Sequence, residues 1–125
     1  MKILLVEDAT ALLRAIELKL KKVGYEVYPC SDGRQALQEL ESFAPDLVIT
    51  DIMLPFVSGL EVLTAAKAKS KKMAVIVFSA MGQENAVEEA FLLGADDYVV
   101  KPFGLKELEM RIKKVMGAMN VDANS

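Results

Sequence analysis

The sequence predicts an α/β fold in which helices cover both faces of a parallel β-sheet. Short apolar runs of strand length recur five times along the 125 residues, and segments with helical spacing lie between them. Three of these runs are continuously apolar, which is typical of strands buried on both faces of a parallel sheet. The alternation indicates a (βα)5 domain with right-handed crossover connections.

The five predicted strands are mostly rich in Val, Ile and Leu, and polar or turn residues follow each of them at once. The first, third and fourth are the continuously apolar ones. The strands are expected at residues 3–6, 25–28, 47–49, 74–78 and 98–100.

Capping residues and apolar side chains three or four residues apart mark the predicted helices. The first begins at Ala9 or Thr10 and ends at residue 23, where Gly24 suits a C-terminal cap. Ser31 and Asp32 can each cap the second helix, which ends before residue 45. The remaining helices are expected after residues 58–59, over about 83–93 and over about 105–116.

The composition excludes several classes of protein. Apolar residues make up 53% of the chain and charged residues 26%, so the chain is not intrinsically disordered. The net charge is −3 and the chain has no His or Trp. We therefore expect no direct binding of nucleic acid and no chemistry that depends on an imidazole.

The cellular compartment follows from the cysteine content and from the lengths of the apolar runs. The single cysteine, Cys30, cannot form an internal disulfide, which suits a reducing compartment, and we expect it to be a small buried apolar residue. No apolar run approaches the roughly 18 residues of a membrane span, and the first one is too short for a signal peptide. We therefore expect a cytoplasmic protein without membrane contact.

Polar side chains follow four of the five predicted strands. Glu7 and Asp8 follow the first, Asp51 follows the third, Ser79 the fourth and Lys101 the fifth. The carboxyl ends of parallel strands meet at one edge of the sheet, where ligands bind in such folds, so these groups should converge. Acidic oxygen ligands without His or Cys suit Mg²⁺ rather than Zn²⁺. A plainer alternative is that the first two acids only cap the first helix, where negative charge is favoured anyway.

The residues Glu7-Asp8, Asp51, Ser79 and Lys101-Pro102 resemble the signature of the response-regulator receiver domain, the CheY-like phosphoacceptor of two-component signalling. The segments 53–55, 59 and 94–98 fit the same family, and the resemblance covers about residues 2–115. It implies a doubly wound, flavodoxin-like five-stranded sheet with the strand order 2-1-3-4-5. We assign residues 1–118 to this receiver domain and residues 119–125 to a polar tail or a truncated linker.

The resemblance implies a role for each residue of the signature. Asp51 would accept a phosphoryl group from the phosphohistidine of a sensor histidine kinase or a phosphotransfer protein. Mg²⁺ would be held by Asp8 directly, by Glu7 through water, by Asp51 itself and by the carbonyl of Met53. Lys101 would contact the phosphoryl oxygens. Such a domain assists its own phosphorylation and dephosphorylation but is not an enzyme acting on other substrates.

The resemblance also implies a switch. Ser79 would donate a hydrogen bond to the attached phosphoryl group, Tyr98 would then turn inward, and the bond before Pro102 is normally cis. The surface of the fourth helix, fifth strand and fifth helix would carry the signal to a downstream protein or output domain. In many relatives this surface forms a homodimer with ion pairs between the two subunits. Three residues of this chain match that dimer surface, but Val87 stands where those relatives have a basic residue. The matching residues are Asp97, Glu107 and Arg111.

Two other classes share features with this sequence. A small flavin electron carrier has the same fold, but Glu7 and Asp8 would repel the flavin phosphate at the loop after the first strand. A metal-dependent phosphatase with an aspartyl nucleophile places Asp-x-Asp after the first strand, and this chain has Glu7-Asp8 there instead. Both patterns fit less well than the receiver.

Overall fold

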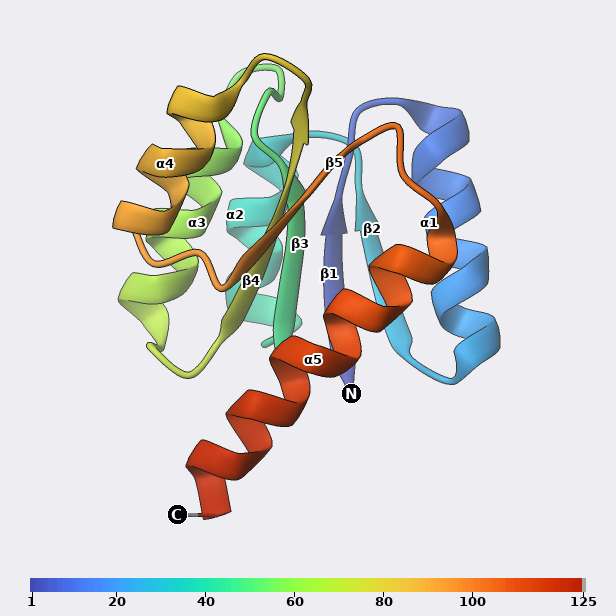
Figure 1. Ribbon diagram of the computed structural model, residues 1–125, viewed down its shortest axis with the longest axis vertical. Helices are drawn as coiled ribbons and strands as arrows, with labels where there is room; N and C mark the ends of the chain where they lie inside the picture. Colours follow the sequence, from blue (N-terminus) through green and yellow to red (C-terminus); the bar gives the residue numbers. More distant parts are fainter. Residues whose placement is uncertain (125) are drawn as a thin grey trace.

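A five-stranded parallel sheet lies between two layers of helices in the computed structural model (Figure 1). The structure describes the backbone of residues 1–124 and the side chains of residues 1–118. The strands are β1 (Lys2–Val6), β2 (Glu26–Cys30), β3 (Leu47–Asp51), β4 (Ala74–Ala80) and β5 (Asp97–Lys101). All neighbouring strands pair in parallel in the order β2-β1-β3-β4-β5, which confirms the predicted topology.

The helices divide between the two faces of the sheet, as Figure 1 shows. They are α1 (Thr10–Val23), α2 (Gly33–Ser42), α3 (Gly59–Lys69), α4 (Glu84–Leu92) and α5 (Leu105–Asn124). One apolar core lies between the sheet and the α2–α3–α4 layer, and a second lies between the sheet and the α1–α5 pair. Both faces of the sheet are therefore closed to water over its central strands.

The central strands are buried on both faces, as their continuous apolar runs predicted. Successive side chains of a strand point to opposite faces, so Leu4 packs in the first core while Ile3 and Leu5 pack in the second. Every residue of β3 is buried, including the polar Thr50, whose hydroxyl donates to the backbone carbonyl of Asp51 at 3.0 Å. The expected burial of Cys30 is confirmed as well.

The helix caps resolve the choices that the sequence left open. The side chain of Asp32 accepts a hydrogen bond from the backbone N–H of Gln35 at 2.9 Å, so Asp32 rather than Ser31 caps α2. Gly24 ends α1 in the left-handed conformation with a φ of 115°, as its position predicted.

The last helix is longer than the sequence predicted. We expected α5 to end near residue 116, and its backbone instead continues to residue 124. The added segment contains no proline, and a single glycine such as Gly117 lowers helix stability by only about 1 kcal/mol, so the helix is not forced to end there. The side chains of the predicted polar tail, residues 119–125, lie outside the described residues.

No helix within residues 1–124 combines the length and the apolar character needed to cross a membrane.

Two glycines allow backbone segments to approach closely behind the carboxyl edge of the sheet. A Cβ on Gly59 would lie 1.9 Å from the carbonyl oxygen of Asp51, and a Cβ on Gly33 would lie 2.2 Å from that of Val57. The first contact packs the start of α3 against the end of β3. The second holds the β3–α3 loop, residues 52–58, against the start of α2.

Candidate functional site

The residues that follow the strands meet at one edge of the sheet. The register pairs Asp51 with Phe78 and Ala80 with Lys101, so β4 and β5 end level with each other and two residues beyond the end of β3, all at the same edge of the sheet. Glu7 directly follows β1, and its backbone N–H donates to the carbonyl of Cys30 at the end of β2. The structure therefore brings together the side chains that the sequence placed after the strands.

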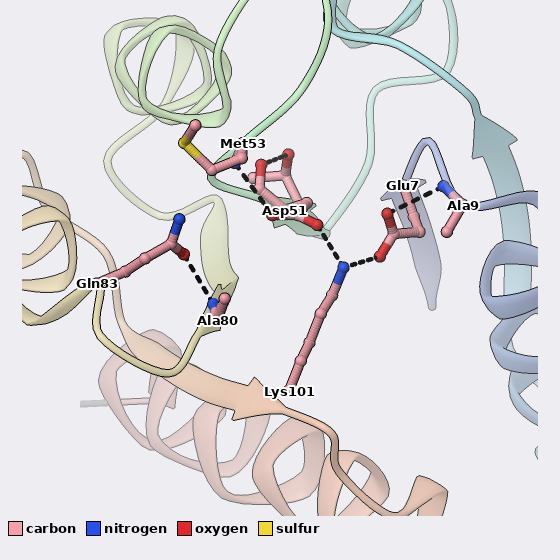
Figure 2. A network of polar contacts seen from close by, with 8 residues as sticks. Glu7, Ala9, Asp51, Met53, Ala80, Gln83 and Lys101 are labelled. Atoms are coloured by element: carbon pink, nitrogen blue, oxygen red, sulfur yellow. Dashed lines mark hydrogen bonds and ion pairs between the residues drawn. The ribbon is translucent and has the colours of Figure 1, made fainter.

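Lys101 lies at the centre of the polar network in Figure 2 and contacts two carboxylates. Its Nζ donates hydrogen bonds to Oε1 of Glu7 and to Oδ2 of Asp51. The second oxygen of Glu7 accepts from the backbone N–H of Ala9 at 3.2 Å, and Oδ1 of Asp51 accepts from the N–H of Met53 at 3.0 Å. Each of the two carboxylates is thus held at both oxygens.

Burial governs the ionisation of this network. Glu7 is fully buried, and the loss of water around its carboxylate raises its pKa, with Lys101 and the Ala9 N–H only partly offsetting the effect. Partial burial would lower the pKa of Lys101, but its hydrogen bonds to Asp51 and Glu7 outweigh this and raise it. The ammonium group therefore stays charged opposite the acids at neutral pH.

A third carboxylate, Asp8, completes an acidic cluster. One oxygen each of Glu7, Asp8 and Asp51 lies within 4.8 Å of the others, which is a spacing that a single metal ion can bridge. Asp8 is exposed, and within residues 1–118 its side chain makes no hydrogen bond or ion pair. Hard oxygen donors of this kind fit Mg²⁺, and Asp8 is the acid whose oxygens are open to it. The two occupied oxygens of Glu7 fit a contact through water.

Ser79 and Tyr98 line the same cavity, and within residues 1–118 neither side chain makes a hydrogen bond to Asp51. This cavity has a volume of about 670 Å³ and lies between the β4–α4 loop, α4 and β5. Ser79 is buried, whereas Tyr98 is partly buried and its ring packs edge-on against Phe91 at 5.7 Å between centroids. The predicted cis bond between Lys101 and Pro102 is present.

The surface predicted to carry the signal consists of α4, β5 and α5, and we call it the α4–β5–α5 surface. Asp97 and Arg111 form an ion pair within the chain at 3.1 Å. The apolar side chain of Leu92 in α4 is 82% exposed on this surface. Val87 lines the cavity at the position where a basic residue was expected in dimeric relatives.

Sequence reasoning missed several residues that position the site. Gln83 accepts a hydrogen bond from the backbone N–H of Ala80 at 2.7 Å and so holds the β4–α4 loop (Figure 2). Phe103 stacks on Phe78 at 4.9 Å and fixes the segment after Lys101. A polar residue just before a helix is the one available signal for Gln83, and nothing in the sequence marks the aromatic pair.

Comparison with known proteins identifies relatives along nearly the whole chain. The family described as the response regulator receiver domain matches residues 3–113. The alkaline phosphatase synthesis transcriptional regulatory protein PhoP of Bacillus subtilis is 33% identical over 124 residues. The probable transcriptional regulator ycf27 of Guillardia theta is 40% identical over 124 residues. These alignments include 99% of this chain but 52% and 48% of the relatives, so the chain spans about half their length.

Solved structures agree with the sequence comparison. A CheY-like response regulator receiver domain protein from Methanospirillum hungatei superposes with a TM-score of 0.92 at 28% identity, covering 97% of each chain. A response regulator receiver domain protein from Clostridium thermocellum gives a TM-score of 0.90 at 29% identity, covering 96% of this chain and 97% of that one. Together with the geometry of the acidic edge, these matches establish that the chain belongs to the response regulator receiver domain family, a family of signalling domains in two-component systems.

Proposed function

We propose that Asp51 is the phosphoacceptor of a phosphorylation-activated switch. The observation that carries this proposal is the position of Asp51 at the end of the central strand, in contact with Lys101 and within reach of two further acids. Glu7 also contacts the lysine and a backbone N–H of the loop after its strand, but Glu7 is fully buried, whereas Asp51 is 7% exposed. The cognate donor is a sensor histidine kinase or a phosphotransfer protein.

In the proposed reaction an oxygen of Asp51 attacks the phosphorus atom of a phosphohistidine. A bond from phosphorus to this oxygen forms while the phosphorus–nitrogen bond breaks, and the imidazole leaves with that electron pair. The backbone N–H of Met53 orients the carboxylate by holding its other oxygen. Lys101 already lies against Asp51, so its ammonium is placed to bind the phosphoryl oxygens as they arrive.

Mg²⁺ would be held by Asp8, Asp51 and the Met53 carbonyl, and by Glu7 through a water molecule. When bound, this ion supplies the positive charge that lets a carboxylate and a phosphoryl group approach each other. The fit is supported by the three oxygens within 4.8 Å of one another and by the open oxygens of Asp8.

The cavity beside the site supports a route for the signal. Ser79 and Tyr98 line the same cavity, so a movement of the hydroxyl toward a phosphorylated Asp51 changes the space available to the tyrosine ring. Phosphorylation adds nearly two negative charges and three acceptor oxygens, which draw Ser79 and Lys101 inward. The rearrangement alters the α4–β5–α5 surface, which acts on a downstream protein or an output domain, or pairs two copies of the chain.

The chain itself is proposed to act as a switch rather than as an enzyme or a direct binder of nucleic acid. Its curated relatives are named as transcriptional regulators, and about half of their length lies outside the match. DNA contact would then belong to a separate output domain, and the receiver would control it.

Labelling with acetyl phosphate tests the acceptor. We expect the parent chain in the presence of Mg²⁺ to gain the mass of one phosphoryl group and Asp51→Asn to gain none. Asp32→Asn is the matched control, because asparagine caps a helix as well as aspartate does and the site is untouched. Equal labelling of the Asp51→Asn variant would contradict the assignment.

A second variant tests the switch separately from the acceptor. Ser79→Ala keeps Asp51 and the acids, so we expect it to accept phosphate but to lose most of the amide chemical-shift changes near Tyr98. Beryllofluoride, which mimics the phosphoryl group, allows the comparison at equilibrium. If Ser79→Ala responds as fully as the parent chain, the hydroxyl does not carry the signal.

A further inference from the structure

The β3–α3 loop contains an aromatic residue in a strained backbone conformation. Phe56 has a φ of 70°, and the N–H of Val57 donates to the carbonyl of Pro55 at 2.9 Å, two residues back. A hydrogen bond of this span around a residue with positive φ describes a γ-turn of the rare, strained type. Bulky side chains seldom adopt this region, whereas glycine enters it freely.

The folded chain gains little from the ring of Phe56 in return for this strain. The side chain is 72% exposed, so it adds almost no buried apolar surface. Its one marked contact is with Arg34 at the start of α2, whose guanidinium lies 3.7 Å from the ring centroid. A cation–π contact between two exposed side chains is weak, but it fixes the direction in which the ring points. Strain that stability does not explain points to a role in binding.

Phe56 belongs to an apolar rim around Asp51. Met53 and Met81 are 63% and 79% exposed, and they lie in the loops that follow β3 and β4 at the carboxyl edge of the sheet. We call Met53, Phe56 and Met81 the acceptor rim. Gly59 packs on the Asp51 carbonyl, and three residues span at most about 11 Å, so Phe56 cannot lie far from the site.

We propose that the acceptor rim is the docking surface for the protein that donates the phosphoryl group, with Phe56 as its anchor. The inference rests on the proposed function, because it assigns the partner of the same site. In-line transfer requires the donor atom to come within about 3.5 Å of Asp51, so the donor protein must cover the surrounding loops. A standard interface buries about 800 Å² on each partner, an area that corresponds to a disc of roughly 16 Å radius, and the rim falls within it.

The chemistry of the rim defines the donor surface. Three exposed apolar side chains call for a protein that presents apolar groups beside its phosphorylated histidine. A small phosphodonor such as acetyl phosphate reaches Asp51 without touching the ring of Phe56. The two kinds of donor should therefore respond differently when the ring is removed.

Phe56→Gly tests the proposal by removing both the ring and the strain. The protein donor is a histidine kinase autophosphorylated with labelled ATP, chosen as the kinase of the source organism that phosphorylates the parent chain fastest. We expect kcat/KM for this donor to fall about tenfold or more, as for an aromatic hot spot, and labelling by acetyl phosphate to change less than about twofold. Phe56→Tyr keeps the ring and should restore most of the kinase rate.

Ala44→Gly is the matched control, because Ala44 also has a positive φ, of 50°, but precedes β3 at the opposite edge of the sheet. It should relieve strain in the same way and leave both donors unaffected. Unfolding in urea should show Phe56→Gly to be at least as stable as the parent chain. A marked loss of stability would mean that the ring is structural and would overturn the proposal.

The outcomes distinguish the docking role of Phe56 from the assignment of Asp51 as the phosphoacceptor. Equal losses with the kinase and with acetyl phosphate, or no loss with either, overturn the docking role of Phe56 and leave Asp51 as the acceptor. Failure of the parent chain to be labelled by either donor overturns the acceptor assignment, and the docking role falls with it.

Discussion

Substituting Gly59 by alanine should move the phosphoacceptor, because the new methyl group has no space. An added Cβ would lie 1.9 Å from the carbonyl oxygen of Asp51 and 2.8 Å from Cα of Ile52. Both obstacles are backbone atoms and cannot rotate away as a flexible side chain would. Either the end of β3 or the start of α3 must move by about 1.5 Å to reach ordinary van der Waals contact, which begins near 3.4 Å.

The structure gives the size of the effect. Overpacking in a well-packed region costs about 1–3 kcal/mol, and a clash with backbone belongs at the upper end, so we expect a loss of about 3 kcal/mol. For a chain of this length that loss lowers the melting temperature by about 10 °C. Displacing the attacking carboxylate by about 1 Å should also slow phosphorylation by roughly 100-fold.

Urea unfolding and acetyl phosphate labelling measure these two effects. Gly117→Ala is the control, because no atom lies within 4 Å of the position that its new methyl group would take and alanine favours the helix by up to about 1 kcal/mol. The two substitutions are chemically identical and should have opposite signs. If Gly59→Ala is as stable as the control variant and is phosphorylated at the parent rate, the close approach behind Asp51 does not constrain the site.

Three further predictions follow from other contacts. Mg²⁺ at ten times its Kd should stabilise the parent chain by about 1.4 kcal/mol, and Asp8→Asn should remove this gain while raising the melting temperature of the metal-free protein, because a like charge is lost. Burial, followed by the charges of Glu39 and Asp32, raises the pKa of Cys30 to about 12, so the native thiol holds its proton more tightly than the unfolded one. Stability should therefore fall as pH rises from about 9 to 12, and Cys30→Ala should make this decline shallower in urea unfolding. Lys67 donates to the Met73 carbonyl at 2.8 Å and to Asp96 at 2.9 Å, so Lys67→Met should cost about 1–2 kcal/mol, and a melting temperature equal to that of the parent would contradict this.

Hydrophobic patterning predicted which strands are central, and the resemblance to the receiver family predicted their order, and the structure confirms both. Element ends were less predictable. The second strand was expected to end at residue 28, but β2 continues through Pro29 to Cys30, which an edge strand tolerates because proline needs no partner for its missing N–H on the open side. The fourth was expected to end at residue 78, but β4 continues through Ser79 and Ala80, which pair with Val100 and Lys101.

The candidate site was predictable as a set of residues but not as a set of contacts. Parallel strands bring their carboxyl ends together, so the residues after them converge whatever their identity. That Lys101 contacts both Glu7 and Asp51 depends on the rotamers of a long flexible side chain, which no local pattern specifies. The positive φ of Phe56 could not be predicted either, because local propensity would place glycine or asparagine there.

Asp97 and Arg111 form their ion pair within one chain, so neither charge is free to pair with a second copy. If Arg111 turned to an acid of a second copy, the buried carboxylate of Asp97 would lose its partner, so one ion pair would replace another and the exchange would add little affinity. The internal pair is thus a competitor of self-association. If the proposed switch shifts β5 against α5, both charges would be released at once, and dimerisation through this surface would then depend on phosphorylation as well as on protein concentration.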